Sequence, residues 1–143
     1  MTRINVIPVE ELADQHLLAE YRELPRALKQ NVNIDGASST YILGPGHVKW
    51  ARRHWNFTYN RFKQICDEMA YRGFYASFNP ENLIHFFRDL TRQIPDGSYI
   101  VNNDDILLNR QRIIERINER QGFYKWTKRK RPSWVENKLK SKN

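Results

Sequence analysis

The first twenty-six residues contain the side chains with the clearest chemical potential. A small residue, Thr2, follows Met1, and its α-amine becomes the chain terminus if Met1 is removed. A helical segment, at about 100° per residue, then brings three polar side chains onto one face, namely Gln15, Arg22 and Arg26. Glu23 lies beside them. A terminal amine, a carboxylate and two guanidinium groups can act as a nucleophile, an acid/base and ligands for phosphate oxygens.

Spacing alone leaves another interpretation of this face equally open. Arg22, Arg26 and Glu23 could pair with one another on a solvated helix, because surface ion pairs are common and weak.

A second set of basic groups lies near the C-terminus. Three arginines are spaced four residues apart, namely Arg112, Arg116 and Arg120. The segment after them interleaves aromatic and basic residues: Phe123, Tyr124, Lys125, Trp126, residues 128–131 and Trp134. Basic groups bind phosphates, and flat rings stack on unpaired bases. The same rings could equally cover the core.

The composition favours one globular domain with an acidic partner. The chain has 143 residues, 40% of them hydrophobic, and a net charge of +8, which is enough apolar material for a real core. Nucleic acid is the first partner to consider, followed by acidic membranes and acidic proteins. A merely soluble basic protein would have a similar composition.

Several classes of site are not expected. Cys66 is the single cysteine, so neither a disulfide framework nor a cysteine metal site is predicted, and the reducing cytoplasm is the expected location. The four histidines lack the spacing of a metalloprotease, and phosphate-loop and hydrolase motifs are absent. We therefore expect no metal and no cofactor. The sequence contains neither the apolar run of a transmembrane helix nor the apolar region of a signal peptide.

The pattern of apolar residues predicts an all-α fold, a compact single domain of three main helices plus a shorter helix. Helices are expected over residues 9–29, 48–72, 80–91 and from Asp104 or Asp105 to 120, with a loop over 31–46. The first helix has an apolar face made by Ala13, Leu17, Tyr21, Leu24 and Leu28.

Local signals predict where these helices bend and end. Pro25 should kink the first helix, Gly73 should cap the second, and Asn79 should open the third. The core candidates of the last helix are Ile106, Leu107, Ile113, Ile114 and Ile117. The domain is predicted to cover residues 1–135, followed by a basic, frayed tail over 136–143.

Several stretches resemble the phage-type endonuclease V family, the pyrimidine-dimer DNA glycosylases. They are TRIN near the start, ELADQHLLAEYRELPR (11–26), ILGPGHV (42–48), RGF (72–74) and FYKW (123–126). The long second stretch is the most specific of them.

This resemblance implies a bifunctional glycosylase and abasic-site lyase that acts on double-stranded DNA containing pyrimidine dimers or abasic sites. After Met1 removal the amine of Thr2 attacks the sugar, with Glu23 as acid/base. The implied DNA-binding residues are Arg3, Gln15, Arg22, Arg26, Arg112, Arg116, Phe123, Tyr124, Lys125 and Trp126. A monomer without cofactor, membrane or obligate protein partner is expected.

The chain also departs from that family. Residues 27–39 form a shorter segment, and the basic tail continues past residue 126. Three alternatives therefore stay open: a non-catalytic helical DNA-binding protein, a related glycosylase for a different modified base, and an RNA-binding protein.

Overall fold

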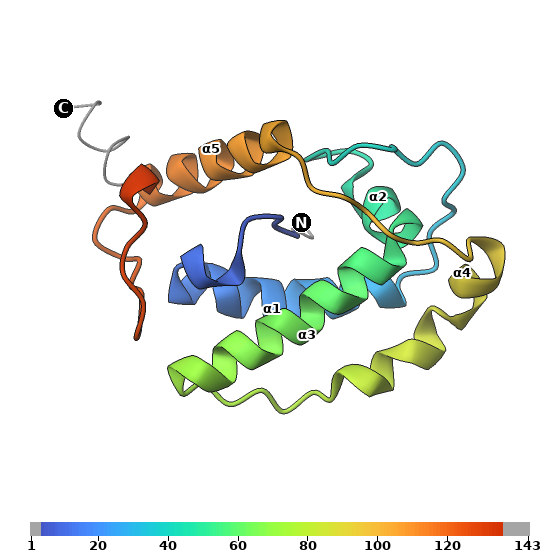
Figure 1. Ribbon diagram of the computed structural model, residues 1–143, viewed down its shortest axis with the longest axis horizontal. Helices are drawn as coiled ribbons and strands as arrows, with labels where there is room; N and C mark the ends of the chain where they lie inside the picture. Colours follow the sequence, from blue (N-terminus) through green and yellow to red (C-terminus); the bar gives the residue numbers. More distant parts are fainter. Residues whose placement is uncertain (1–3, 136–143) are drawn as a thin grey trace.

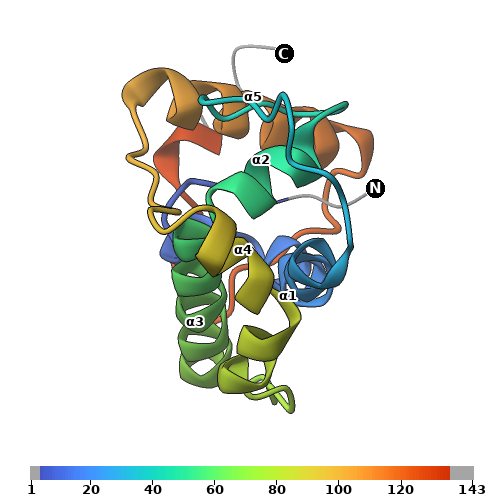
Figure 2. The same ribbon diagram turned by 90° about the vertical axis from the view of Figure 1, so that its right-hand side faces the viewer.

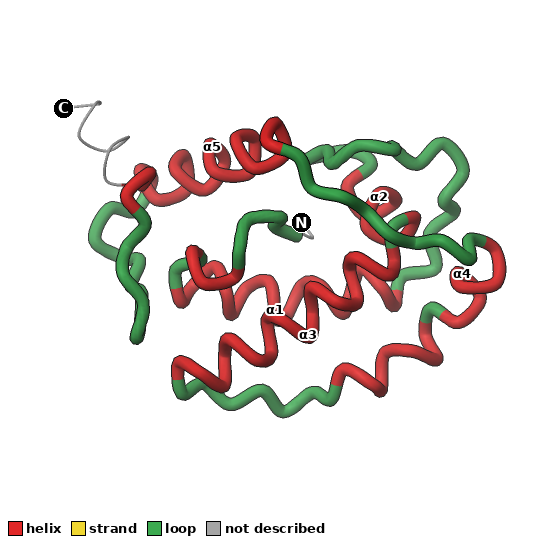
Figure 3. Tube along the Cα trace, in the orientation of Figure 1, coloured by secondary structure: helices red, strands yellow, loops and turns green. Residues whose placement is uncertain are grey.

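The computed structural model describes residues 4–135, in which helices joined by loops occur and no strand is present (Figure 3). In chain order the elements are η1 (Val9–Glu11), α1 (Asp14–Lys29), α2 (His47–Arg53), α3 (Trp55–Arg72), η2 (Pro80–Phe86), α4 (Arg88–Gln93) and α5 (Asn103–Glu119), where η marks a 3-10 helix. The prediction of an all-α fold is confirmed. None of these helices combines the length and apolar character needed to cross a membrane.

The helices α1 and α3 form the centre of the molecule. They pack against each other, and α1 also packs against α2 and η2. In Figures 1 and 2, α5 lies across the molecule from the α1–α3 pair. The N-terminal segment runs between α5 and α1 (Figure 1), so it is enclosed by elements from both halves of the sequence.

Two apolar clusters hold these elements together. One gathers residues around Trp50 and Phe62, and the other gathers residues around Ile65 and Ile117. The predicted apolar face of α1 is confirmed, since four of its members are buried, Ala13, Leu17, Leu24 and Leu28, and Tyr21 packs against both clusters. Both α1 and α3 contribute to each cluster, which makes them the shared wall of the core.

The core prediction for α5 is right in part. Ile113, Ile114 and Ile117 are buried, and Ile106 packs against the second cluster. Leu107 is 61% exposed, so its assignment to the core is wrong.

The single helix predicted over 48–72 is wrong, because His54 divides it into α2 and α3. The backbone N–H groups of Asn56 and Phe57 donate to Gly97 O, at 3.0 and 3.2 Å, instead of to carbonyls of the preceding turn. The His54 ring lies 3.0 Å from Ser98 O. These partners are about forty residues away, so local periodicity contains no sign of the break.

The first predicted helix is also interrupted. The chain forms η1 and then starts α1 at Asp14, whose N–H donates to Lys125 O at 2.7 Å. Pro25 lies inside α1 and is buried. Gly73 ends α3 with a φ of 89°, as predicted, and this left-handed conformation favours glycine.

Two further helices, η2 and α5, begin at asparagine caps. Asn79 caps η2 as predicted, accepting the N–H of Glu81 at 3.0 Å, but Phe87 is buried in the core and separates η2 from α4. The start predicted at Asp104 or Asp105 is wrong: Asn102 is the cap, and Asp105 completes a reciprocal capping box with it. Such a box satisfies two otherwise unpaired backbone donors.

Candidate functional site

The described N-terminal residue, Ile4, is fixed at both of its backbone polar groups. Its N–H donates to His47 Nε2 at 2.8 Å, and its carbonyl accepts from Tyr41 Oη at 2.7 Å. The side chain is fully buried. The point from which the preceding residues extend is therefore set by α2 and by the loop before it.

A buried polar network holds the next residues against α1 and α3. Asn5 Nδ2 donates to Glu20 Oε1 at 2.8 Å, and Arg61 binds both oxygens of Glu20, at 2.8 and 3.1 Å. The same Arg61 donates through Nη1 to Ile7 O. Because all these groups are buried, each one needs a partner, and the network supplies it.

Asn109 of α5 completes this anchoring from the other side. Its Oδ1 accepts the N–H groups of Val6 and Ile7, at 2.7 and 3.1 Å, and its Nδ2 donates to Asn5 Oδ1 at 2.8 Å. These contacts span more than one hundred residues of sequence, and the sequence analysis missed them. An asparagine at an apolar position of a helical pattern is the one signal that could have indicated them.

Glu23 lies on α1 one turn beyond Glu20. Its side chain is 25% exposed, and Arg26 Nη1 lies 3.4 Å from Glu23 Oε1. The Arg26 side chain is 67% exposed, and Arg22 is exposed as well. The local Glu–Arg pairing is thus present for Arg26, in an exposed geometry that contributes little stability. The arrangement leaves a partly screened carboxylate beside two solvent-facing cations.

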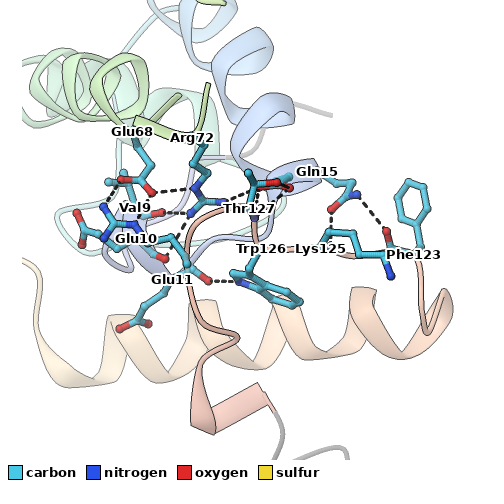
Figure 4. A network of polar contacts seen from close by, with 12 residues as sticks. Val9, Glu10, Glu11, Gln15, Glu68, Arg72, Phe123, Lys125, Trp126 and Thr127 are labelled. Carbon is cyan, nitrogen blue, oxygen red and sulfur yellow. Dashed lines mark hydrogen bonds and ion pairs between the residues drawn. The ribbon is translucent and has the colours of Figure 1, made fainter. Parts of the chain in front are cut away.

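Gln15 is placed differently from the two arginines. Its Nε2 donates to Phe123 O at 3.0 Å, and its Oε1 accepts the N–H of Lys125 at 3.1 Å (Figure 4). The structure therefore brings Gln15 together with the aromatic-basic segment, residues 123–127, at the start of α1.

That segment is tied down further by a chain of alternating charges (Figure 4). Arg72 Nη1 lies 2.9 Å from Asp14 Oδ1, and Arg72 Nε lies 2.8 Å from Glu68 Oε2. Arg129 binds both Glu68 oxygens, at 2.9 and 2.8 Å. Burial alone would raise the pKa of Glu68, but the bonds from Arg129 and Arg72 outweigh it and hold that pKa below its ordinary value.

Most of the aromatic rings near the C-terminus cover the core. Tyr124 stacks on His16 with ring centres 4.6 Å apart, and Trp126 Nε1 donates to Glu11 O at 3.0 Å. Tyr124, Trp126 and Trp134 pack against the second apolar cluster. Phe123 stays 40% exposed. The core-covering interpretation is thus observed for all of these rings except Phe123.

The basic ridge of α5 is partly neutralised by its own acidic residues. Arg112 Nε lies 3.7 Å from Glu115, and Arg116 Nη1 lies 3.3 Å from Glu119. Arg120 lies over the Phe123 ring, 3.7 Å from its centre. These arginines remain at the surface, so their ion pairs can be exchanged for other anions.

Residues 4–135 provide neither a metal-binding cluster nor a readily ionised thiol. No cluster of three or more His, Cys, Asp or Glu side chains in this range could hold a metal ion. Burial, with a smaller contribution from Asp67, raises the pKa of the Cys66 thiol to about 11, which suppresses the reactive thiolate. Two of the predicted site residues, Thr2 and Arg3, lie outside the described residues, as does the tail 136–143.

The site therefore consists of a rigidly held N-terminal segment, a carboxylate one turn along α1, exposed arginines beside it and a clamped aromatic-basic segment. A sequence model of one family, described as pyrimidine dimer DNA glycosylase, matches residues 1–82. The match covers the N-terminal segment and all of α1, α2 and α3. The chain belongs to the pyrimidine dimer DNA glycosylase family.

Proposed function

We propose that this protein excises pyrimidine dimers with the α-amine of Thr2, after removal of Met1, and then cleaves the strand as an abasic-site lyase. Glu23 serves as the acid/base. The reaction needs neither a metal nor a cofactor, and a monomer carries it out on double-stranded DNA.

One observation carries the proposal: the backbone of Ile4 is fixed by His47 and Tyr41. Thr2 is two residues away in the chain, and two residues span at most about 7 Å. Asn5 is bonded to Glu20, one helical turn before Glu23. A short tether and a fixed anchor restrict the amine to the neighbourhood of this part of α1, which favours reaction through proximity.

An α-amine suits this chemistry better than a lysine does. Its ordinary pKa is near 7.7–8.0, against about 10.4 for lysine, so roughly a tenth to a sixth of it is neutral at pH 7. Neighbouring arginines favour the neutral form further. The terminal amine is therefore a usable nucleophile without an additional base.

The amine nitrogen bonds to sugar C1′, and the bond from C1′ to the damaged base breaks with its electron pair leaving on the base. Loss of a proton from nitrogen leaves a ring-closed aminal. The sugar ring then opens: the C1′–O4′ bond breaks, O4′ takes up a proton, and nitrogen and C1′ form a protonated imine. A base then removes a proton from C2′, and the C3′–O bond breaks with its electrons leaving on the phosphate. Glu23 moves protons in these steps, and water finally hydrolyses the imine.

The DNA-binding surface comprises the exposed Arg22 and Arg26, together with Arg3. The α5 ridge adds Arg112 and Arg116. The remaining contribution comes from the segment with Phe123, Tyr124, Lys125 and Trp126, to whose backbone Gln15 is bonded. Phosphate contacts of this kind position the duplex and make binding depend on salt. Damaged steps cost less to distort, which adds selectivity.

Trapping with borohydride tests the proposal, because the reagent reduces an imine to a stable amine. The purified protein is first weighed by mass spectrometry to establish that Met1 is gone. Incubation with dimer-containing duplex should then give a covalent complex, and peptide mapping should place it on Thr2. A control protein with one extra N-terminal residue before Thr2 should give none. Absence of a complex from the processed protein on both dimer and abasic DNA would leave a non-catalytic DNA-binding protein.

A further inference from the structure

We infer that Gln15 is a positioning residue, which acts on DNA through Lys125 instead of contacting DNA itself. The inference rests on the proposed function, because it assumes that the segment 123–127 meets the DNA. It assigns to the first turn of α1 the task of aiming a cation that lies about 110 residues away in the sequence.

Both polar groups of the Gln15 amide are already used in hydrogen bonds within the protein. Nε2 donates to Phe123 O at 3.0 Å, and Oε1 accepts from the N–H of Lys125 at 3.1 Å. The adjacent N–H of Asp14 donates to Lys125 O at 2.7 Å. Three hydrogen bonds thus join one helical turn to the backbone on both sides of Tyr124. They fix the backbone position from which the Lys125 side chain extends.

The chain beyond Lys125 is held as well. Thr127 donates through N–H and Oγ1 to Asp14, at 3.0 and 2.6 Å, and Arg129 binds Glu68. Asp14 in turn is held by Arg72. Lys125 therefore lies on a stretch of backbone that is pinned at both ends (Figure 4).

Lys125 keeps its charge available. Its side chain is exposed, and no carboxylate within residues 4–135 lies at ion-pairing distance from it. By contrast, Glu68 engages Arg129, and glutamates of α5 engage Arg112 and Arg116. A cation on a fixed backbone, without an ion-pair partner among residues 4–135, is suited to a phosphate contact.

Charge supplies a direct test, because Gln15 is neutral. A neutral side chain releases no counterion when it meets a phosphate, so removing a direct contact of Gln15 would weaken binding without altering the salt dependence. The slope of log K against log salt is negative. Each lost phosphate contact of a cation reduces the magnitude of this slope by about 0.9 in duplex DNA. A neutral residue whose removal reduces that magnitude acts through a charged one.

The experiment measures binding of a fluorescent duplex containing a tetrahydrofuran abasic analogue, over a series of salt concentrations. The proteins are the wild type, Gln15→Ala, Lys125→Ala and the double variant, with Gln111→Ala on the exposed side of α5 as the matched control. We expect Lys125→Ala to reduce the magnitude of the slope by about 0.9, and Gln15→Ala to reduce it by most of that amount. The double variant should match Lys125→Ala, because residues that act as one unit are not additive.

Two results would overturn the inference. One is weaker binding by Gln15→Ala with the wild-type slope, which would indicate a direct contact. The other is wild-type binding by Gln15→Ala. Melting curves establish that each variant is folded, and if Gln15→Ala is not, Thr127→Val loosens the same segment from the other end and should also reduce the magnitude of the slope. Borohydride trapping of the wild type separates these results from failure of the proposed function.

Discussion

The backbone N–H of Ile4 donates to Nε2 of His47 at 2.8 Å, and the other ring nitrogen of His47 lies 2.8 Å from Ile42 O. These partners imply a neutral ring that is protonated on Nδ1. The first residue of α2 thus connects the N-terminal segment to the loop before that helix. His47 thereby fixes the residue from which the proposed nucleophilic end of the chain extends.

Replacing His47 should therefore reduce both stability and trapping. His47→Ala leaves the buried N–H of Ile4 without its acceptor, which costs about 1–3 kcal/mol. We expect a lower melting temperature and slower imine trapping at a temperature where the variant is folded. His85→Ala, at an exposed position, is the control and should match the wild type. A folded His47→Ala protein with normal trapping would show that this anchor does not serve the chemistry.

Glu23→Gln should retain DNA binding and stop turnover on dimers. The substitution keeps the shape of a partly exposed side chain but removes the group that exchanges protons. Single-turnover cleavage of dimer-containing duplex measures the loss, and gel-shift binding to the same duplex serves as the control. Cleavage at the wild-type rate would remove Glu23 from the active site.

Arg26→Gln should weaken binding and flatten its salt dependence. The side chain is largely exposed and its bond to Glu23 is long, so its charge is available to a phosphate. Losing that contact should reduce the magnitude of the negative slope of log K against log salt by about 0.9. Arg92→Gln, another exposed arginine with an acidic neighbour on its own helix, is the matched control. Equal slopes for the two variants would mean that Arg26 does not bind DNA.

Glu68 should make stability depend on pH. Its folded-state pKa is held below the ordinary value by Arg129 and Arg72, so its stabilising effect is complete above the unfolded pKa of about 4.3. The effect disappears as the pH falls through the folded pKa. Glu68→Gln should cost about 3 kcal/mol at pH 7 and progressively less below about pH 4.

Denaturant unfolding of both proteins at several pH values checks this expectation. Asp89→Asn, which removes an exposed carboxylate, should change stability little at any pH. A difference between wild type and Glu68→Gln that stayed constant down to pH 3 would contradict the argument.

Sequence reasoning succeeded where the decisive interaction is local. The buried face of α1 follows from the spacing of Leu17, Leu24 and Leu28, since a helix brings such positions to one side. Gly73 ends α3 because a left-handed residue is needed there, and Asn79 caps η2 through its own neighbour Glu81. Each of these outcomes depends on residues within one or two turns.

Sequence reasoning was wrong where a group distant in the sequence decides the local structure. The break at His54 depends on Gly97 O. The misplaced start of α5 is a separate, local error, because the capping box joins Asn102 and Asp105, only three residues apart. The sequence also grouped Gln15 with Arg22 and Arg26, because all three share a helix face. Only the packed chain shows that the Gln15 amide is bonded to Phe123 and Lys125.

The amino-acid sequence by itself determined the helical class, the core face of α1, the exposed arginines and the resemblance to a glycosylase family, because periodicity, charge and motif are properties of neighbouring residues. The tertiary structure decided how the N-terminal segment from Ile4 onward is held. His47, Glu20 and Asn109 reach Ile4, Asn5 and Val6 from three different helices. Hydrogen bonds to buried backbone groups depend on which segments meet in space, and local spacing does not specify that.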